Sequence, residues 1–212
     1  MFKKQHHVIL KNAINPEFAN FLFKYFLMKE QVCYTLKTIK YLPPNCWDYG
    51  LFNDSQCNNA FATYGDIAFE TLLEQLKPQM EKATGMPLIP TYAYARLYRE
   101  GSELKAHKDR DSCDISTTLF LGGDRWPIWF KIKGKKKYIN LNPGDMIAYR
   151  GTMLEHGRDP FHGSGGTNNL ICAQVFLHYN KADIKNRNLY DSRPHLGIFD
   201  KSITKDVVMD DK

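Results

Sequence analysis

The sequence lacks the marks of several protein classes. Its five cysteines are scattered among 212 residues and form no C-x-x-C pair, which argues against a disulfide framework and against a zinc knuckle. No apolar run reaches the roughly 18 residues that a membrane-spanning helix needs. The basic start is followed by only three apolar residues, Val8 to Leu10, too few for a secretory signal. We therefore expect a cytoplasmic protein with reduced thiols and no membrane partner.

The excess of positive charge is small and local. Lys and Arg number 29 against 23 Asp and Glu, a net charge of +6. Five of the lysines fall within residues 131–137, around Gly134. A glycine between two candidate strands predicts a hairpin, and its lysines would discourage pairing with another sheet edge. The charge therefore gives no evidence for a nucleic-acid-binding face.

Two helices are predicted before residue 88. Asn15, Pro16 and Glu17 make a typical helix start, and apolar residues recur at helical spacing from Phe18, Phe21 and Leu22 to Tyr25 and Phe26. Asp66 caps a second helix that is expected to end at Gly85. Residues 43–65, between the helices, are rich in Pro, Asn, Asp and aromatic residues without a sustained period, so we predict an extended loop that helps to bind the substrate.

Short segments rich in aromatic and β-branched residues follow from residue 88. They predict strands near 91–99, 104–109, 115–121, 126–132, 137–141, 145–149, 153–158 and 169–179. No helix-length pattern separates them, which is typical of an antiparallel sandwich or barrel. We therefore predict a mainly β fold with flanking helices, a jelly roll. The chain is expected to form one domain: 1–87 as helical support and substrate loop, 88–180 as the core, and 181–212 as a polar tail.

A histidine and a carboxylate stand two residues apart at His107 and Asp109. Such residues of one strand share a face, so the two side chains would meet inside the barrel. Alone, the pair fits a surface strand with alternating charges equally well. His156 can complete the set, because a jelly roll brings distant strands side by side. Two histidines and a carboxylate suit an Fe(II) oxygenase, although zinc accepts a similar set for hydrolysis.

Residues 94–109, which read Y-A-R-L-Y-R-E-G-S-E-L-K-A-H-K-D, resemble the Fe(II)/2-oxoglutarate dioxygenases. The likeness is to the prolyl-4-hydroxylase-like branch, in which a strand ending in Tyr, a Gly-containing turn and an H-x-D strand recur. The later segments are also similar: a strand at 116–121, Pro-Gly-Asp at 143–145, and a closing strand at 173–179. The likeness covers residues 91–180, and its order and spacing make it far more specific than H-x-D alone.

The resemblance implies a double-stranded β-helix, the cupin-like jelly roll, with His107, Asp109 and His156 as the catalytic residues that hold Fe(II). It implies 2-oxoglutarate and O2 as co-substrates and allows ascorbate as a further cofactor. The reaction it implies is hydroxylation of a C–H bond with release of succinate and CO2. Halogenating members of the family have a small residue in place of the carboxylate. The presence of Asp109 therefore favours hydroxylation.

The distal carboxylate of 2-oxoglutarate needs a cation, since a buried unpaired carboxylate is costly. In the resembling family this cation is a Lys or Arg on the last core strand, but this sequence departs from that pattern and has Leu170 at the corresponding place. Arg158 stands two residues after His156 and is our predicted partner. An exposed Arg158 paired with Asp159 is the alternative, and the cation would then be Arg96 or Lys131.

Two further residues are candidates for the co-substrate pocket. Tyr98 can donate its phenol to the same carboxylate, or can simply pack in the core. Gln174 either faces inward, where it needs a hydrogen-bond partner, or faces solvent.

The expected substrate is a prolyl or related amino-acid side chain, free or in a peptide, by analogy with the branch of closest likeness. We expect Trp47, Tyr49 and Asn53 and the face near Arg125 and Arg150 to bind it. Demethylation of alkylated nucleic acid is the alternative, but the paired arginines that follow the distal histidine in base-repair enzymes are missing. A binding module without metal is a third possibility, against which the complete His-Asp-His set argues. The sequence carries no signal for an oligomeric state.

Overall fold

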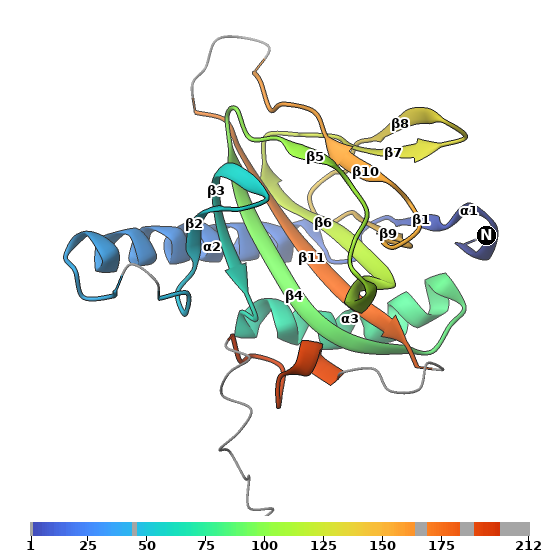
Figure 1. Ribbon diagram of the computed structural model, residues 1–212, viewed down its shortest axis with the longest axis horizontal. Coiled ribbons are helices and arrows are strands. Elements are labelled where there is room, and N and C mark those ends of the chain that lie inside the picture. The colour runs from blue at the N-terminus through green and yellow to red at the C-terminus, as the bar shows by residue number, and fades with distance from the viewer. Residues whose placement is uncertain (1, 44–45, 164–168, 183–188, 200–212) are drawn as a thin grey trace, which may run out of the picture.

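Two antiparallel β-sheets face each other in the computed structural model, and two long helices cover the outer face of the larger sheet (Figure 1). The structure describes residues 2–43, 46–163, 169–182 and 189–199. The strands are β1 (His7–Leu10), β2 (Leu51–Asp54), β3 (Cys57–Tyr64), β4 (Leu88–Arg99), β5 (Leu104–His107), β6 (Ile115–Gly123), β7 (Ile128–Ile132), β8 (Lys135–Ile139), β9 (Met146–Tyr149), β10 (His156–Arg158) and β11 (Ile171–Lys181). The helices are α1 (Phe2–Gln5), α2 (Pro16–Thr38) and α3 (Ile67–Thr84), with 3-10 turns η1 (Asp111–Cys113) and η2 (Leu189–Ser192).

The sheet order explains how distant segments meet. The seven-stranded sheet runs β1-β9-β6-β11-β4-β3-β2, and the four-stranded sheet runs β5-β10-β7-β8. The eight strands expected after residue 88 are all present, with ends that differ by a few residues. The predicted mainly β jelly roll with flanking helices is therefore confirmed.

Both long helices begin where the sequence placed them. The Asn15 side chain accepts a hydrogen bond from the Phe18 amide at the start of α2, and Asp66 caps α3, which ends at Gly85 with φ of 68°. The predicted apolar stripe of α2 is confirmed at Leu22 and Phe26, which are buried, but not at Phe18 and Phe21. Phe21 is 64% exposed, whereas its neighbour Leu22 is buried, because the sheet meets the adjacent face of the helix.

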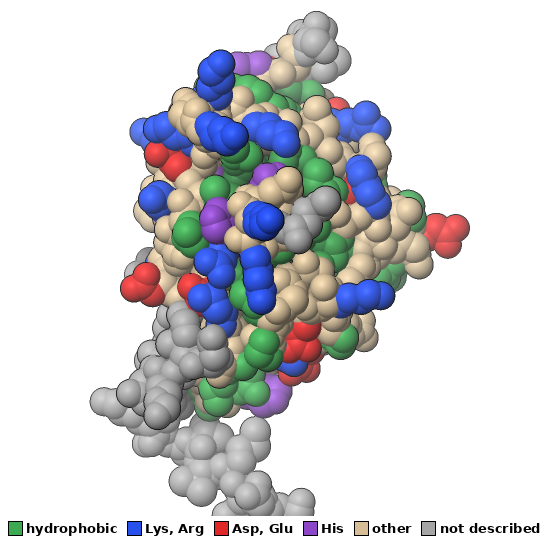
Figure 2. Space-filling model, turned by 90° about the vertical axis from the view of Figure 1, so that its right-hand side faces the viewer, with side chains coloured by type: hydrophobic (Ala, Val, Ile, Leu, Met, Phe, Trp, Pro, Cys, Tyr) green, Lys and Arg blue, Asp and Glu red, His purple; other side chains and the backbone are tan. Residues whose placement is uncertain are grey.

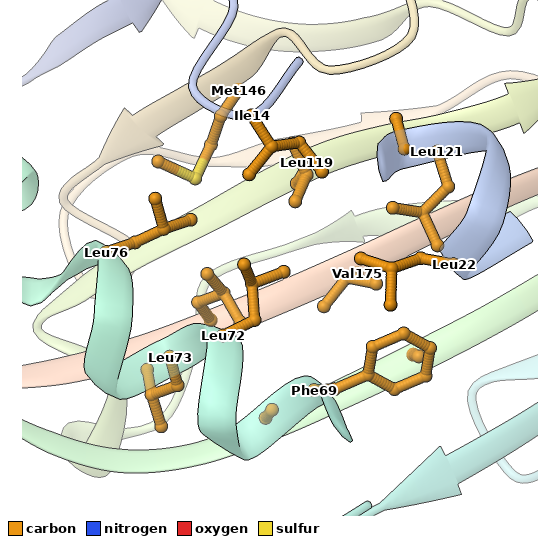
Figure 3. Packing of buried hydrophobic residues seen from close by; sticks show 14 of the residues in the cluster. Ile14, Leu22, Phe69, Leu72, Leu73, Leu76, Leu119, Leu121, Met146 and Val175 are labelled. Atoms are coloured by element: carbon orange, nitrogen blue, oxygen red, sulfur yellow. The ribbon is translucent and has the colours of Figure 1, made fainter. Parts of the chain in front are cut away.

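The larger sheet has a core on each of its two faces. Its outer face packs against α2 and α3, and Figure 3 shows Leu22, Phe69 and Leu72 of the helices beside Leu121 and Val175 of the strands. Its inner face contributes Tyr98, Phe120, Cys172 and Phe176 to a second apolar cluster, which Phe130 of the four-stranded sheet completes from the other side. Because alternate residues of a strand point to opposite faces, the strands of the larger sheet contribute to both cores.

Residues 51–64 form a β-hairpin, so the predicted extended loop over 43–65 is wrong. β3 pairs with β4, with Phe61 opposite Leu97, and β2 pairs with β3. Asp54 Oδ1 accepts hydrogen bonds from the Gln56 and Cys57 amides and so closes the turn. The Asn-rich sequence of these strands is typical of turns, which is why they were not predicted. They form strands because β3 pairs with the edge of β4. The short elements α1 and β1 were also not predicted.

The lysine-rich segment forms the predicted hairpin. Lys133 and Gly134 connect β7 and β8 with φ of 50° and 77°, as a two-residue hairpin turn requires. Lys and Arg side chains are prominent across the face of the molecule on that side (Figure 2). All five cysteines are free thiols, as expected. Within the described part of the chain, no helix has the length and apolar character needed to cross a membrane.

A buried ion pair fastens the C-terminal segment 189–199 beside the larger sheet. Arg193 Nη2 lies 2.6 Å from Glu70 Oε1, and the two side chains are 0% and 1% exposed. Arg193 also donates to the Thr91 carbonyl at 3.0 Å. The expected polar tail 181–212 is described only in part, because residues 183–188 and 200–212 lie outside the described residues.

Replacing Glu70 by Gln should destabilise the protein by about 3–5 kcal/mol, because it leaves the buried Arg193 guanidinium without its counter-charge. Urea unfolding followed by circular dichroism measures the change. Lys77→Gln is the matched control, since it breaks the more exposed Lys77–Glu81 pair (2.8 Å) and should cost no more than about 0.5 kcal/mol. Equal losses in the two variants would contradict the special role of the buried pair.

Candidate functional site

The structure brings together His107, Asp109 and His156 between the two sheets. β10 pairs with β5 so that His156 lies directly opposite His107. Asp109 Oδ1 is 3.6 Å from His107 Nε2 and 3.5 Å from His156 Nε2. One ligand atom from each of the three residues lies within 4.8 Å of the others. The H-x-D spacing predicts that Asp109 lies on the same strand as His107, but β5 ends at His107. Asp109 follows β5, where its amide donates to the Gly151 carbonyl at 3.0 Å.

Both histidines are held in the tautomer that a metal requires. His107 Nδ1 lies 2.8 Å from the Lys105 carbonyl oxygen, and His156 Nδ1 lies 2.9 Å from that of Leu154. A carbonyl oxygen can only accept a hydrogen bond, so each Nδ1 carries the proton and each Nε2 keeps a lone pair. Such a bond to the far nitrogen is the usual way in which a protein orients a metal-binding imidazole.

Ser116 orients the carboxylate of Asp109. Its hydroxyl donates to Asp109 Oδ2 at 2.5 Å and lies 3.1 Å from His178 Nδ1, which leaves Asp109 Oδ1 to face the histidines. A Cβ atom at Gly151 would overlap Asp109 Oδ2, so the glycine makes room for this arrangement. Ser116 and Gly151, which contact Asp109, and His178, which contacts Ser116, were missed, because these contacts depend on strand pairing and no local pattern singles the residues out.

The electrostatics favour an ionised carboxylate at Asp109 and a neutral imidazole at His156. Burial opposes the charge of Asp109, but the hydrogen bond with His107 and the coulombic interactions with His156 and His178 outweigh it and hold the pKa of Asp109 well below its usual range. Burial lowers the pKa of His156 to about 4. For His107, the effect of burial is exceeded by its hydrogen bonds to Asp109 and the Lys105 carbonyl, so the pKa is raised. Ionised carboxylates and neutral imidazoles are the forms that bind metals.

The three side chains line a cavity of about 640 Å³. Aromatic side chains form much of its wall, including Tyr64, Tyr92, Tyr94, Tyr149 and Phe176. The β2–β3 hairpin contributes residues 53–56. A cavity of this size suits a small molecule or a side chain of a larger one.

The residues expected to bind a substrate are only partly at this cavity. Trp47 and Asn53 line it, but Tyr49 does not. Arg125 and Arg150 are also outside it: Arg125 donates to Asn142 Oδ1 at 2.7 Å, and Arg150 points to Met153. The structure therefore does not bring these two arginines to the cavity that holds the three converging residues.

Arg158 is buried in the interior, with 1% of its surface exposed. Its guanidinium donates to the Trp126 carbonyl and to Thr118 Oγ1, and lies 5.2 Å from the centre of the Trp126 ring. Its Nε has no partner among the described residues, and no described carboxylate forms an ion pair with it. The exposed alternative paired with Asp159 is wrong, because Asp159 pairs with Lys136 at 2.7 Å.

Tyr98 and Gln174 face the same region. Tyr98 is fully buried, its hydroxyl has no partner among the described residues, and its ring packs 4.9 Å from that of Trp126. Burial raises the pKa of Tyr98. Gln174 Oε1 accepts from Thr118 Oγ1 at 3.0 Å, so the solvent-facing alternative is wrong. The three residues predicted for the co-substrate therefore gather around Thr118 and Trp126.

The other two candidate cations already have carboxylate partners. Arg96 Nε lies 2.7 Å from Asp54 Oδ2, and both side chains are buried. Lys131 Nζ lies 3.1 Å from Glu155 Oε1 near the surface. Arg158 thus differs from both in having a buried charge that no described carboxylate balances.

Comparison with known proteins identifies the fold. No family model and no curated sequence matches the chain, but solved structures do. A Pseudomonas putida prolyl-4-hydroxylase superposes with a TM-score of 0.58 over 85% of this chain and 95% of its own, at 12% identity. HygX from Streptomyces hygroscopicus, with nickel and 2-oxoglutarate bound, gives 0.59 over 92% and 91%, at 10% identity. A viral collagen prolyl hydroxylase from Paramecium bursaria Chlorella virus-1 gives 0.56 over 84% and 98%, at 9% identity.

The chain has the fold of the Fe(II)/2-oxoglutarate oxygenases. The fold implied by the resemblance of residues 91–180 is therefore confirmed, and the match extends over most of the chain. At such low identity the likeness concerns the fold, and the chemistry has to be argued from the site itself.

Replacing Gly151 by Ala should weaken metal binding by about 10- to 100-fold, because the new methyl group displaces the Asp109 carboxylate from its place beside Ser116. Titration with Mn(II) in a calorimeter measures the affinity, and His107→Ala shows the value expected when a ligand is lost. Gly163→Ala is the matched control, since its methyl group meets only the Leu170 side chain at 3.3 Å. Wild-type affinity in Gly151→Ala would contradict the assigned geometry.

Proposed function

We propose that this protein is an Fe(II)- and 2-oxoglutarate-dependent oxygenase that hydroxylates a C–H bond and releases succinate and CO2. The observation that carries the proposal is the convergence of two imidazole lone pairs and one carboxylate oxygen within 4.8 Å. This donor set occupies one side of a metal and leaves positions open, as in Fe(II) oxygenases. The fold, shared with such oxygenases, supports the same reading.

The residues present fit the metal. His107 Nε2, His156 Nε2 and Asp109 Oδ1 would hold Fe(II), and their outer contacts fix their orientation. The metal with 2-oxoglutarate would supply the activation of O2. The chain would bind and orient both reactants and keep water from the reacting atoms.

The residues around Arg158 fit 2-oxoglutarate. A buried guanidinium without a carboxylate partner is unfavourable by itself, and an incoming carboxylate would balance its charge. The free Nε of Arg158 and the free hydroxyl of Tyr98 are donors that such a carboxylate would satisfy. Gln174 acts through Thr118, which it holds beside the guanidinium. We therefore assign the distal carboxylate to Arg158 and Tyr98.

For the substrate we infer a prolyl or related amino-acid side chain, free or in a peptide. Two of the structures with this fold are prolyl hydroxylases. The aromatic wall of the cavity suits a ring such as that of proline. Lys108 precedes Asp109 and lines the same cavity, where it would receive the carboxylate of an amino acid or an acidic residue of a peptide. Arg110 also lines the cavity, but it is already paired with Asp191 at 2.7 Å.

Replacing Arg158 by Gln should weaken the binding of 2-oxoglutarate to the Mn(II)-loaded protein by about 10- to 100-fold, the usual value of a hydrogen bond to a charged group. Calorimetry measures this affinity, and Mn(II) binding itself should persist. Lys131→Gln serves as the control, because Lys131 pairs with Glu155 at the surface, and it should bind 2-oxoglutarate as the wild type does. Unchanged affinity in Arg158→Gln would move the assignment to Arg96.

Release of succinate from 2-oxoglutarate should be stimulated by proline, by proline-containing peptides or by other free amino acids, since the cavity accepts a side chain of that size. The assay compares these compounds with methylated oligonucleotides, and His107→Ala gives the background. Stimulation by oligonucleotides alone would overturn the proposed substrate. Failure of the wild type to consume 2-oxoglutarate with any compound, or alone, would overturn the proposed reaction.

A further inference from the structure

Tyr149 lies against the ligand atom of His156. It ends β9, its side chain is buried, and its ring packs 4.7 Å from the His156 ring and 4.9 Å from that of Phe130. The Tyr149 hydroxyl oxygen is 3.3 Å from His156 Nε2. Among the described residues this nitrogen is the hydroxyl's only hydrogen-bond partner.

The direction of this hydrogen bond follows from the other side of the ring. His156 Nδ1 donates to the Leu154 carbonyl, so Nε2 can only accept. The phenol of Tyr149 therefore donates to the same lone pair that would bind the metal.

One lone pair cannot serve both partners. When a metal takes His156 Nε2, the Tyr149 hydroxyl loses its acceptor, and a buried hydroxyl without an acceptor is costly. Among the described residues no hydrogen bond joins Tyr149 to Asp109, whose Oδ2 accepts from Ser116 and whose Oδ1 faces the two histidines. The hydroxyl then needs an acceptor that arrives with the metal.

The position of Tyr149 indicates where that acceptor would lie. Tyr149 lines the same cavity as His107, Asp109 and His156, and its hydroxyl is 3.3 Å from the ligand atom of His156. A ligand oxygen held beside the metal in this cavity would therefore lie near the hydroxyl. In the proposed function, 2-oxoglutarate supplies such an oxygen.

We propose that Tyr149 is a co-substrate-binding residue whose hydroxyl transfers its hydrogen bond from His156 Nε2 to an oxygen atom of 2-oxoglutarate. This inference rests on the proposed function. The Tyr149 hydroxyl would then have two successive hydrogen-bond partners. In the metal-free protein Tyr149 holds the His156 ring in place, and in the loaded protein it orients the co-substrate.

Tyr149→Phe tests the inference, because the ring contacts with His156 and Phe130 remain and only the hydroxyl is lost. Binding of 2-oxoglutarate to the Mn(II)-loaded variant should weaken by about tenfold, the effect of one hydrogen bond. Mn(II) alone should bind at least as tightly as to the wild type, since the phenol no longer competes for Nε2. Calorimetry measures both affinities.

Tyr179→Phe is the matched control. Tyr179 is equally buried, but its hydroxyl donates to the Leu73 carbonyl at 2.7 Å on the helix side of the sheet. It should lose stability without any change in either affinity. Unchanged 2-oxoglutarate affinity in Tyr149→Phe, or equal weakening in Tyr179→Phe, would overturn the role of Tyr149. A wild type that binds Mn(II) but not 2-oxoglutarate would instead overturn the proposed function.

Discussion

The antiparallel pairing of β5 with β10 is the constraint on which the rest of the site depends. It places His107 and His156 opposite each other, with ring centres 4.4 Å apart, as expected for directly paired residues. β7 pairs with the other edge of β10 and sets Phe130 beside His156. Because side chains alternate between the two faces of a strand, a shift of one residue would turn His156 away from Asp109.

A strand of only three residues carries both ends of the proposed co-substrate site. Gly157, between His156 and Arg158, has no room for a side chain, since a Cβ atom there would lie 2.6 Å from the Leu104 carbonyl oxygen and 2.8 Å from the Trp129 ring. Trp129 thus covers the outer side of β10 while the two neighbouring side chains are buried on the inner side. The spacing between His156 and Arg158 is fixed by the strand, so in the proposed function the two ends of 2-oxoglutarate would bind at set positions.

The positions of the strands along the chain were predictable because they depend on local alternation, and the three converging residues were predictable because they belong to a motif with fixed spacing. The β2–β3 hairpin was not, because what holds it is distant in the sequence. Asp54 closes its own turn and also accepts from Tyr94 and Arg96, some forty residues later. Neither the turn-like sequence of residues 51–64 nor a periodic pattern of apolar residues within it reveals these partners. The contacts of Asp109 with Ser116 and Gly151 were hidden for the same reason.

The surroundings of Arg158 show why charge at a site is hard to read from a sequence. Asp159 is its neighbour in the chain and looks like its partner. In the fold Asp159 faces outward, where Lys136 and Tyr138 of the β7–β8 hairpin bind it. The lysine-rich hairpin therefore does more than protect a sheet edge. By holding Asp159 at the surface it helps to leave the Arg158 guanidinium without a carboxylate of its own, and a buried cation in that state is suited to bind one from a ligand.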